Sequence, residues 1–446
     1  MVAMKEKIEE LLQEKKYVSA GNILKDMEPA DIAILLEECT KEEVLLLYRI
    51  LPKELAAEVF VEMDGDTQEE LIRAFSDKEL KEVLDELYMD DTVDIIEEMP
   101  ANVVKRILKH SDPDSRKVIN ELLKYPKDSA GSIMTIEYVS LRKTMTVEDA
   151  FARIRATGVD KETIYTCYVT ETNRTLVGIV SVKTLLLSDK QSRIGDIMDT
   201  SFISIETLDD QEDVAKKFDK YGFLAIPVVD KEKRLVGIVT FDDAMDVIHE
   251  ETQEDFEIMA AMTPSEDSYF KTSVWAHSRN RIFWLLFLML SSTITGSILT
   301  AYESAFASIP LLVSFIPMVM GTGGNCGSQS STMIIRGLAT DEIQMRDFFK
   351  AVFKELRIAL LVGSCLAVVN GIRVYVFYHS WEIALVLGLT LMITTALAKT
   401  MGCVLPMLAK KLKLDPAIMA APLISTIVDS CSVFVYFNIA MQILPI

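Results

Sequence analysis

The chain has 446 residues, half of them apolar, so it is long enough for two or three domains and too apolar to be largely disordered. Its net charge of −21 argues against a nucleic-acid partner, because phosphate binding needs clustered Lys and Arg. The charge is unevenly divided: residues 1–270 hold 33 basic and 59 acidic side chains, and residues 271–446 hold 13 and 8. An acidic, charge-rich part is therefore joined to a sparsely charged, apolar part.

The six cysteines are scattered and form no CxxC pair, so neither a disulfide framework nor a zinc site is expected. Residues 1–16 are amphipathic and charged, without the apolar core of a signal peptide. We therefore expect the N-terminus to stay in the cytosol.

Residues 20–128 carry apolar side chains at helical spacing in short segments that repeat every 11 to 13 residues. This pattern predicts an all-α superhelical N domain over residues 1–128, of unspecified hand. Asp90, Asp91 and Asp94 stand out as acids on one segment, although a solvated helix face would also explain them. The segments begin near Asp31, Glu43, Leu55, Gln68, Glu79, Thr92, Val104 and Arg116.

An internal repeat follows. The hexapeptide Leu176–Ser181 recurs as Leu235–Thr240, 59 residues later, and Ser132–Thr135 is echoed by Asp196–Asp199. Each copy reads as strand, helix, β-hairpin and helix. The pattern resembles a tandem CBS-domain pair with α/β folds at 129–190 and 191–250. That resemblance implies an adenine nucleotide such as ATP as a ligand, while a repeated scaffold without ligand is the alternative.

The segment 242–255 after the repeat is strongly acidic and helix-prone, and we expect residues 251–280 to form an acidic connecting helix that leads to the apolar half. Asp415 lies on a short loop that we expect at the same membrane surface. Divalent cations at millimolar concentration can bridge acids on separately movable parts, and the acids repel one another without cations. The sequence thus predicts a gate closed by cytosolic cations.

Five apolar stretches in 281–446 are each long enough to cross a bilayer: roughly Ile282–Ala301, Ile309–Ile335, Val352–Phe377, Ile383–Leu408 and Ala417–Ile443. Lys and Arg gather on the flanks that share a side with the N-terminus. We therefore expect a membrane domain of five transmembrane helices in the cell membrane, with the N-terminus in the cytosol and the C-terminus outside. The alternative is that the five stretches only anchor a cytosolic enzyme in the lipid.

Two intramembrane features favour ion conduction. The second stretch holds four glycines with Asn325 and Gln329, which must be buried in protein or line a wet cavity. Asp429 lies about 12 residues, or about 18 Å, into the last stretch, and intramembrane acids mark ion pathways by default. A buried pair with Lys399 is the alternative, although Lys399 lies toward the inner end and could snorkel to the surface.

A symmetric homodimer would bring two copies of Asp429 together, and a divalent cation would relieve their repulsion. The scarcity of further ligands suits Mg²⁺, which keeps its waters and binds through one or two carboxylates. Cys326 and Cys431 leave a transition metal such as Co²⁺ or Mn²⁺ open. No nucleophile–base pair is apparent among the four histidines, so an enzyme is not expected.

From about residue 20 to its end, the chain resembles the MgtE family of magnesium channels and transporters. The order of parts matches, and two motifs carry the resemblance. The first motif consists of Pro317, Met320-Gly321, Gly323-Gly324-Asn325 and Gly327-Ser328-Gln329-Ser330. The second motif consists of Asp415-Pro416-Ala417, Pro422, Thr426 and Asp429. The resemblance implies a Mg²⁺-conducting homodimer with Asp429 as pore acid and Asn325 lining the pore. It also implies closure by Mg²⁺ bound between the N domain, the CBS pair and an acidic connecting (plug) helix.

The sensor ligands implied by the resemblance are all acids of the soluble part or the inner mouth. They are Asp90, Asp91, Asp94, Glu212, Asp243, Asp246, Glu250, Glu251, Glu254 and Asp415. The chain departs from the family at Tyr221-Gly222, where an acid often follows the tyrosine, at Ser430-Cys431-Ser432 after the pore acid, and at Cys326. A membrane-anchored nucleotide-sensing regulator is the alternative of another class.

Overall fold

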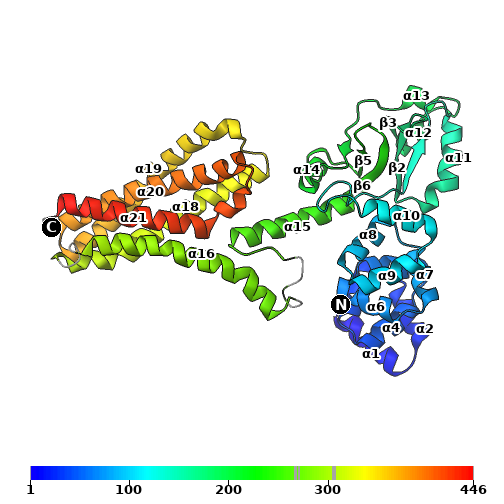
Figure 1. Cartoon of the computed structure of the whole chain (residues 1–446), viewed down its shortest axis with the longest axis horizontal. Helices are drawn as coiled ribbons and strands as arrows, with labels where there is room; N and C mark the ends of the chain where they lie inside the picture. The colour runs from blue at the N-terminus through cyan, green and yellow to red at the C-terminus, as the bar shows by residue number, and fades with distance from the viewer. Residues whose placement is uncertain (1, 266–268, 270–271, 304–307, 445–446) are drawn as a thin grey trace. The chain divides into compact units, whose positions relative to one another are not determined.

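The computed structural model describes residues 2–265, 269, 272–303 and 308–444. The chain divides into two compact units, Met1–Ile248 and His249–Ile446 (Figure 1). Each is described below by itself.

The first unit begins with α1 (Val2–Gln13) and α2 (Tyr17–Leu24), followed by eight short helices. Each of these eight starts 12 residues after the one before it, two or three residues earlier than predicted, so the predicted period is confirmed. They are α3 (Pro29–Glu37), α4 (Lys41–Arg49), α5 (Lys53–Val61), α6 (Gly65–Ala74), α7 (Asp77–Leu84), α8 (Met89–Glu98), α9 (Ala101–His110) and α10 (Pro113–Leu122).

Local capping signals set several of these starts. Ser76 caps α7: its hydroxyl oxygen accepts from the backbone N–H of Glu79, and the Glu79 carboxylate accepts from the backbone N–H of Ser76. These two hydrogen bonds form a capping box. Asp112 caps α10, and Pro113 occupies the first helical position, where its missing N–H is not needed. Between helices, Arg106 of α9 donates to the carbonyl oxygens of Ile72 and Phe75 at the end of α6. Arg106 thereby satisfies carbonyl groups at the end of α6 and links α6 to α9.

Two matching three-stranded sheets follow, and the predicted α/β repeat is confirmed. In the first, β1 (Tyr138–Leu141) pairs parallel with β2 (Thr163–Thr170), which pairs antiparallel with β3 (Leu176–Ser181). The strands β4 (Ile205–Glu206), β5 (Ala225–Val229) and β6 (Leu235–Thr240) repeat this order. The accompanying helices are α11 (Val147–Thr157), η1 (Gly158–Asp160), α12 (Val182–Leu187), α13 (Ile194–Ile197) and α14 (Gln211–Tyr221).

The two sequence echoes pack against each other across the repeats. A Cβ at Gly237 would lie 2.7 Å from the sulfur of Met134, and a Cβ at Gly178 would lie 2.7 Å from the sulfur of Met198. Met134, at the start of the first repeat, thus covers the glycine of the second, and Met198 does the reverse. Both glycines are needed because a side chain at either position would overlap the methionine.

Among its described residues, the second unit contains five helices longer than 20 residues: α16 (Val274–Ala301), α18 (Ile316–Ala339), α19 (Phe348–Tyr378), α20 (Trp381–Lys411) and α21 (Ala421–Ile443). Among the described residues, α16, α20 and the segments Met345–Tyr378 and Pro416–Ile443 are long and apolar enough to cross a membrane. The helix α18 falls outside this group because glycines, hydroxyls and amides dilute its apolar residues. Short 3₁₀ segments complete the unit: η2 (Pro310–Phe315), η3 (Met345–Asp347) and η4 (Pro416–Met419).

The second predicted span is wrong in one respect. It was expected as one stretch over Ile309–Ile335, but Pro310–Phe315 forms the 3₁₀ segment η2, and the α-helix begins only at Ile316. Pro317 lies in the first turn of α18, where proline is tolerated because its missing N–H has no partner within the helix there. The polar motif therefore lies near the start of α18.

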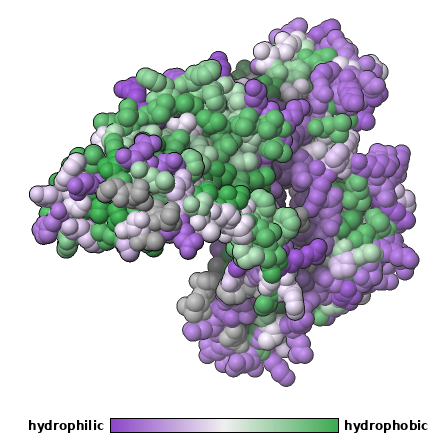
Figure 2. All heavy atoms as spheres, turned by 60° about the vertical axis from the view of Figure 1, so that its left-hand side comes forward, coloured by the Kyte–Doolittle hydropathy of each residue, from purple (hydrophilic) through white to green (hydrophobic). Residues whose placement is uncertain are grey.

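The surface of the second unit is apolar where lipid would touch it. On α16 and α19, Phe283, Leu361 and Phe377 are 69%, 76% and 74% exposed. Figure 2 shows hydrophobic residues covering much of this unit and hydrophilic residues over much of the other. The chain is a multi-pass membrane protein with a large hydrophilic part.

Candidate functional site

Acids from three elements meet in the first unit. Asp90 and Asp91 open α8, Glu162 precedes β2, and Asp243 lies in the first turn of α15 (Phe241–Met259). The predicted acidic helix is thereby confirmed as α15. Asp90 is 5% exposed, and Oε2 of Glu162 is buried with no hydrogen-bond partner among the described residues. We call Asp90, Asp91, Glu162 and Asp243 the acidic cluster.

Burial and mutual repulsion disfavour ionisation of the acidic cluster. Burial, followed by the charge of Asp243, raises the pKa of Asp91 to about 6 and the pKa of Asp90 well above its usual range. Burial, followed by the charge of Asp91, raises the pKa of Glu162 to about 8. Burial also raises the pKa of Asp243 to about 6. Full ionisation of the cluster would create more negative charge than the protein alone stabilises, and a bound cation would offset that charge.

Local structure places each of these acids. Asp243 accepts from the backbone N–H of Thr240 at 3.1 Å and from its hydroxyl, so the carboxylate is held against the end of β6. The corresponding position of the first repeat, 59 residues earlier, is Thr184, so only the second repeat supplies an acid here. The backbone N–H of Glu162 donates to the carbonyl of Glu137 at 3.0 Å, which brings both acids to the same end of β1 and β2.

The acidic cluster is not a preformed cage. Across the residues that the structure describes, no group of three His, Cys, Asp or Glu side chains is arranged to hold a metal ion directly. A hydrated Mg²⁺ does not need such a cage, because it keeps several waters and is bound by one or two carboxylates. Sequence reasoning found Asp90, Asp91 and Asp243 but missed Glu162 and Glu137, which have no acidic neighbours on one helix face to signal them.

The other predicted sensor acids are not part of this buried group. Asp94 and Asp246 are exposed on α8 and α15, although Asp246 is near enough to Asp243 for its charge to help raise the pKa of Asp243. Glu212 lies on α14 and forms an ion pair with Lys216 at 2.7 Å. Asp415 caps η4 by accepting from the N–H of Ala417 at 2.7 Å. The remaining three, Glu250, Glu251 and Glu254, follow on the later turns of α15, within the second unit.

Those later turns end against one end of the membrane unit. Ile258 and Met259 of α15 pack on Ile335 of α18 and on Ala417 and Ala420 around η4. The acidic helix therefore ends directly beside the loop that begins at Asp415.

The two membrane motifs face each other. A Cβ at Gly324 of α18 would lie 3.2 Å from Oγ of Ser425 and 3.8 Å from Oδ1 of Asp429 on α21. At Gly327 it would lie 2.6 Å from Ile424, so the glycines bring α18 and α21 into close contact. Asp429 is half-buried eight residues after the start of α21, about 12 Å along that helix.

A polar face of α18 remains uncovered in the single chain. Gly321, Asn325 and Gln329 lie four residues apart along one side of the helix, and all three are exposed. Amides on a lipid-facing helix are costly, because lipid offers no hydrogen-bond partner. This face must therefore be covered by water or by protein.

Lys399 does not behave as predicted. It is 5% exposed rather than extended to the membrane surface, and its nearby carboxylate is Glu355 of α19, with Nζ and Oε2 3.9 Å apart, rather than Asp429. The helices α18, α19 and α20 enclose it, so the side chain cannot snorkel. Sequence reasoning missed Glu355 because it counted Lys399 as the only other charge well inside a span.

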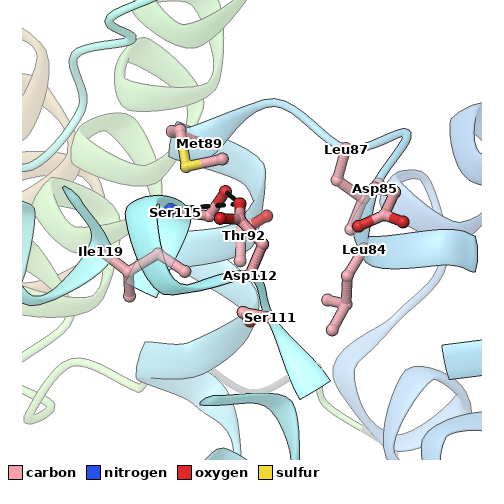
Figure 3. Close-up of a pocket in the computed structure, with 9 residues that line it drawn as sticks. All are labelled: Leu84, Asp85, Leu87, Met89, Thr92, Ser111, Asp112, Ser115 and Ile119. Carbon is pink, nitrogen blue, oxygen red and sulfur yellow. Dashed lines mark hydrogen bonds between the residues drawn. The ribbon is translucent and has the colours of Figure 1, made fainter. Parts of the chain in front are cut away.

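A surface pocket in the N-terminal helices is not a cation site. Figure 3 shows Asp85 and Asp112 among its lining residues, which come from α7 to α10 and their connections. As the cap of α10, the Asp112 carboxylate already accepts from the backbone N–H groups of Asp114 and Ser115 and from the Ser115 hydroxyl. Asp85 is bonded to Lys81 at 3.0 Å. Both carboxylates are thus used within the fold.

Comparison with known families gives matches over most of the chain. Residues 316–439 match the MgtE family of divalent cation transporters, residues 27–128 match the MgtE intracellular N domain, and residues 130–189 and 194–250 match CBS domains. The chain is 35% identical to the magnesium transporter MgtE of Thermus thermophilus over 98% of both chains. It is 31% identical to the magnesium transporter MgtE of Bacillus subtilis, over 96% of this chain and 95% of that one.

Solved structures agree with these matches. The crystal structure of the cytosolic domain of the Mg²⁺ channel MgtE in complex with ATP has a TM-score of 0.52 and 36% identity. That comparison covers 55% of this chain and 99% of the other. The crystal structure of the soluble part of a magnesium transporter has a TM-score of 0.53 and 29% identity, and it covers 56% of this chain and 99% of that one. With near-complete coverage by relatives above 30% identity, this chain belongs to the MgtE family of divalent cation transporters.

Proposed function

We propose that the protein conducts Mg²⁺ into the cell and is closed by Mg²⁺ on the cytosolic side. The observation that carries the transport function is the apposition of the two membrane motifs, with Oδ1 of Asp429 beside Gly324 and a polar face at Asn325. An acid at that depth attracts cations, and the relatives named as magnesium transporters indicate which cation. We place the N-terminus in the cytosol and the C-terminus outside the cell membrane.

The pore is completed by a second copy of the chain. In the single chain Asp429 is half-buried, and the face of α18 that carries Gly321, Asn325 and Gln329 is exposed. A two-fold axis beside α18 and α21 would cover this face and bring two carboxylates to one path, where a hydrated divalent cation relieves their repulsion. A monomer in native membranes, shown by crosslinking or single-molecule photobleaching, would contradict this assembly.

Closure is attributed to the acidic cluster and to the end of α15. Mg²⁺ bound at Asp90, Asp91, Glu162 and Asp243 would offset their repulsion and hold the start of α15 against the N domain and the first CBS repeat. The other end of α15 packs on Ala417 and Ala420, next to the segment that would border the inner mouth. Cytosolic Mg²⁺ is thereby linked to the position of α15. ATP at the CBS pair is proposed on the likeness to the ATP-bound relative, and calorimetric titration tests it.

The test is the Mg²⁺ current in inside-out membrane patches while Mg²⁺ on the cytosolic face is raised to about 10 mM, above the range of weak oxygen-ligand sites. We expect current at low Mg²⁺, closure at high Mg²⁺, and no current in Asp429→Asn. The matched control is Glu382→Gln, which removes an acid at the other end of the membrane unit, in the first turn of α20. Equal current in Asp429→Asn and the control would refute the pore assignment.

The same current measurement distinguishes Mg²⁺ transport from the second candidate function, transport of another divalent cation. A family of divalent cation transporters allows Co²⁺ or Mn²⁺ as the cargo, and Cys326 and Cys431 lie close to the two motifs. Larger currents with Co²⁺ or Mn²⁺ than with Mg²⁺ would favour that cargo. Absence of any current from folded, inserted protein would favour a carrier or an anchored regulator.

A further inference from the structure

A buried charge pair joins three helices of the membrane unit. Lys399 on α20 and Glu355 on α19 are 5% and 8% exposed, and Ser330 on α18, at 2% exposure, lies between them. The hydroxyl of Ser330 donates to Oε2 of Glu355 at 2.5 Å and accepts from Nζ of Lys399 at 3.2 Å. Both hydrogen-bonding roles of the hydroxyl are thus used, so its orientation is fixed.

The bridged pair lies behind the polar face of α18. Residues advance by about 100° in an α-helix, so Ser330 points about 140° away from Asn325. The burial agrees with this geometry, because Ser330 is enclosed while Asn325 and Gln329 are exposed. A contact that fixes the back of the helix therefore also fixes the direction of its front.

Close backbone packing surrounds the same point. Gly402 follows Lys399 by one turn of α20, and a Cβ there would overlap the carbonyl oxygen of Gly327 and lie 3.0 Å from the backbone nitrogen of Ser331. Ser331 donates to the carbonyl of Met419 in η4. At Ser330 and Ser331, α18 is therefore bonded on one side to α19 and α20 and on the other to the segment that leads into α21.

Lipid anchoring alone would not need such a pair. Two charges removed from water cost more than their attraction returns unless further hydrogen bonds satisfy them, and an apolar pair of similar volume is often as stable. A directional, bridged pair is instead suited to holding one helix in one rotation.

We propose that Glu355, Lys399 and Ser330 are positioning residues, which hold α18 in the rotation that directs Asn325 and Gln329 toward the ion path and so set the preference for Mg²⁺. This assignment rests on the proposed function. The residues contact no ion; they act through α18.

The test uses the full-length protein in lipid vesicles, with Mg²⁺ flux and Ca²⁺ flux measured per folded molecule. We expect Glu355→Gln and Ser330→Ala each to lower Mg²⁺ flux about 10-fold or more and to change the Mg²⁺ to Ca²⁺ ratio, as loss of a group that orients a cation ligand does. The control is Tyr436→Phe, which removes an equally buried hydrogen bond, from the Tyr436 hydroxyl to the carbonyl of Leu312 at 3.0 Å. The control should lose thermal stability but keep the ratio.

A second variant covers the case in which a single change leaves a buried charge and prevents folding. Combining Glu355→Gln with Lys399→Met removes both charges, and such replacements usually fold. We expect this double variant to fold and still to show the altered ratio. Wild-type flux and ratio in the double variant and in Ser330→Ala would overturn the assignment. A wild-type protein that carries no Mg²⁺ would overturn the proposed function and the assignment with it, so the two failures are distinguishable.

Discussion

Replacing Asp91 by Asn removes one charge from the acidic cluster without changing the shape of the side chain. Burial and the charge of Asp243 raise the pKa of Asp91 from 3.8 to about 6. Each pKa unit corresponds to about 1.4 kcal/mol, so the ionised carboxylate costs the folded state about 2 to 3 kcal/mol when no cation is bound. The amide would remove that cost.

The pH dependence follows from the sign of the change. A carboxyl whose pKa is raised by folding holds its proton more tightly in the folded state than in the unfolded state. The cost is therefore absent below about pH 4, accumulates between about pH 4 and 6, and is complete above about pH 6. We expect Asp91→Asn to stabilise the cation-free protein near pH 8 and to have little effect near pH 4.

Magnesium should reduce the stability advantage of the variant. A site with a dissociation constant of about 1 mM gains about 1.4 kcal/mol at about 10 mM Mg²⁺. The wild type should gain this stabilisation, while the variant, with one carboxylate fewer, should gain less. The gap between the two proteins should therefore narrow by about 1 kcal/mol when Mg²⁺ is added.

The assay is hydrogen–deuterium exchange of the full-length protein, which reports the opening free energy of α8 and of the start of α15 with and without Mg²⁺. Glu97→Gln is the matched control, because Glu97 is an exposed carboxylate on the same helix. The reasoning would be refuted if Asp91→Asn destabilised α8 at about pH 8 without cations, or if Mg²⁺ protected variant and wild type equally.

Two further changes test the packing and the helix caps. Gly402→Ala places a methyl group against the carbonyl of Gly327 and should lower the stability of the membrane unit by about 1 to 3 kcal/mol. Gly371→Ala is the control, because nothing lies within 4 Å of its new methyl group, and it should be neutral or stabilising by up to about 1 kcal/mol. Thermal melting of both variants in detergent measures the difference. Glu79→Gln should lower the free energy of unfolding by about 1 kcal/mol at neutral pH, because the hydrogen bonds from Ser76 and Arg49 stabilise the ionised carboxylate and lower the pKa of Glu79 to about 2. This stabilisation of the wild type is lost as the pH falls from about 4.5 toward 2. Equal stability of Glu79→Gln and wild type at neutral pH would contradict this account.

Several features could be predicted because local chemistry decides them. Apolar spacing and caps such as Ser76 fix where each short helix begins, and the 59-residue echo fixes the repeated strand order. Long apolar runs predict the membrane helices, because about 20 consecutive apolar residues in a helix match the thickness of the hydrocarbon core. The start of the second span was misplaced because an apolar count does not distinguish the 3₁₀ turn at Pro310 from the α-helix that follows.

The sequence by itself determined the order of the parts, the acidic helix and the two membrane motifs, one of which contains Asp429. Only the tertiary structure decided which acids meet. Glu162 joins the acidic cluster because β2 starts beside Glu137 under α8, and Glu355 meets Lys399 because α18, α19 and α20 approach at glycines. Both partnerships depend on packing between segments far apart in the chain, and isolated charges without periodic neighbours leave no local pattern that could reveal them.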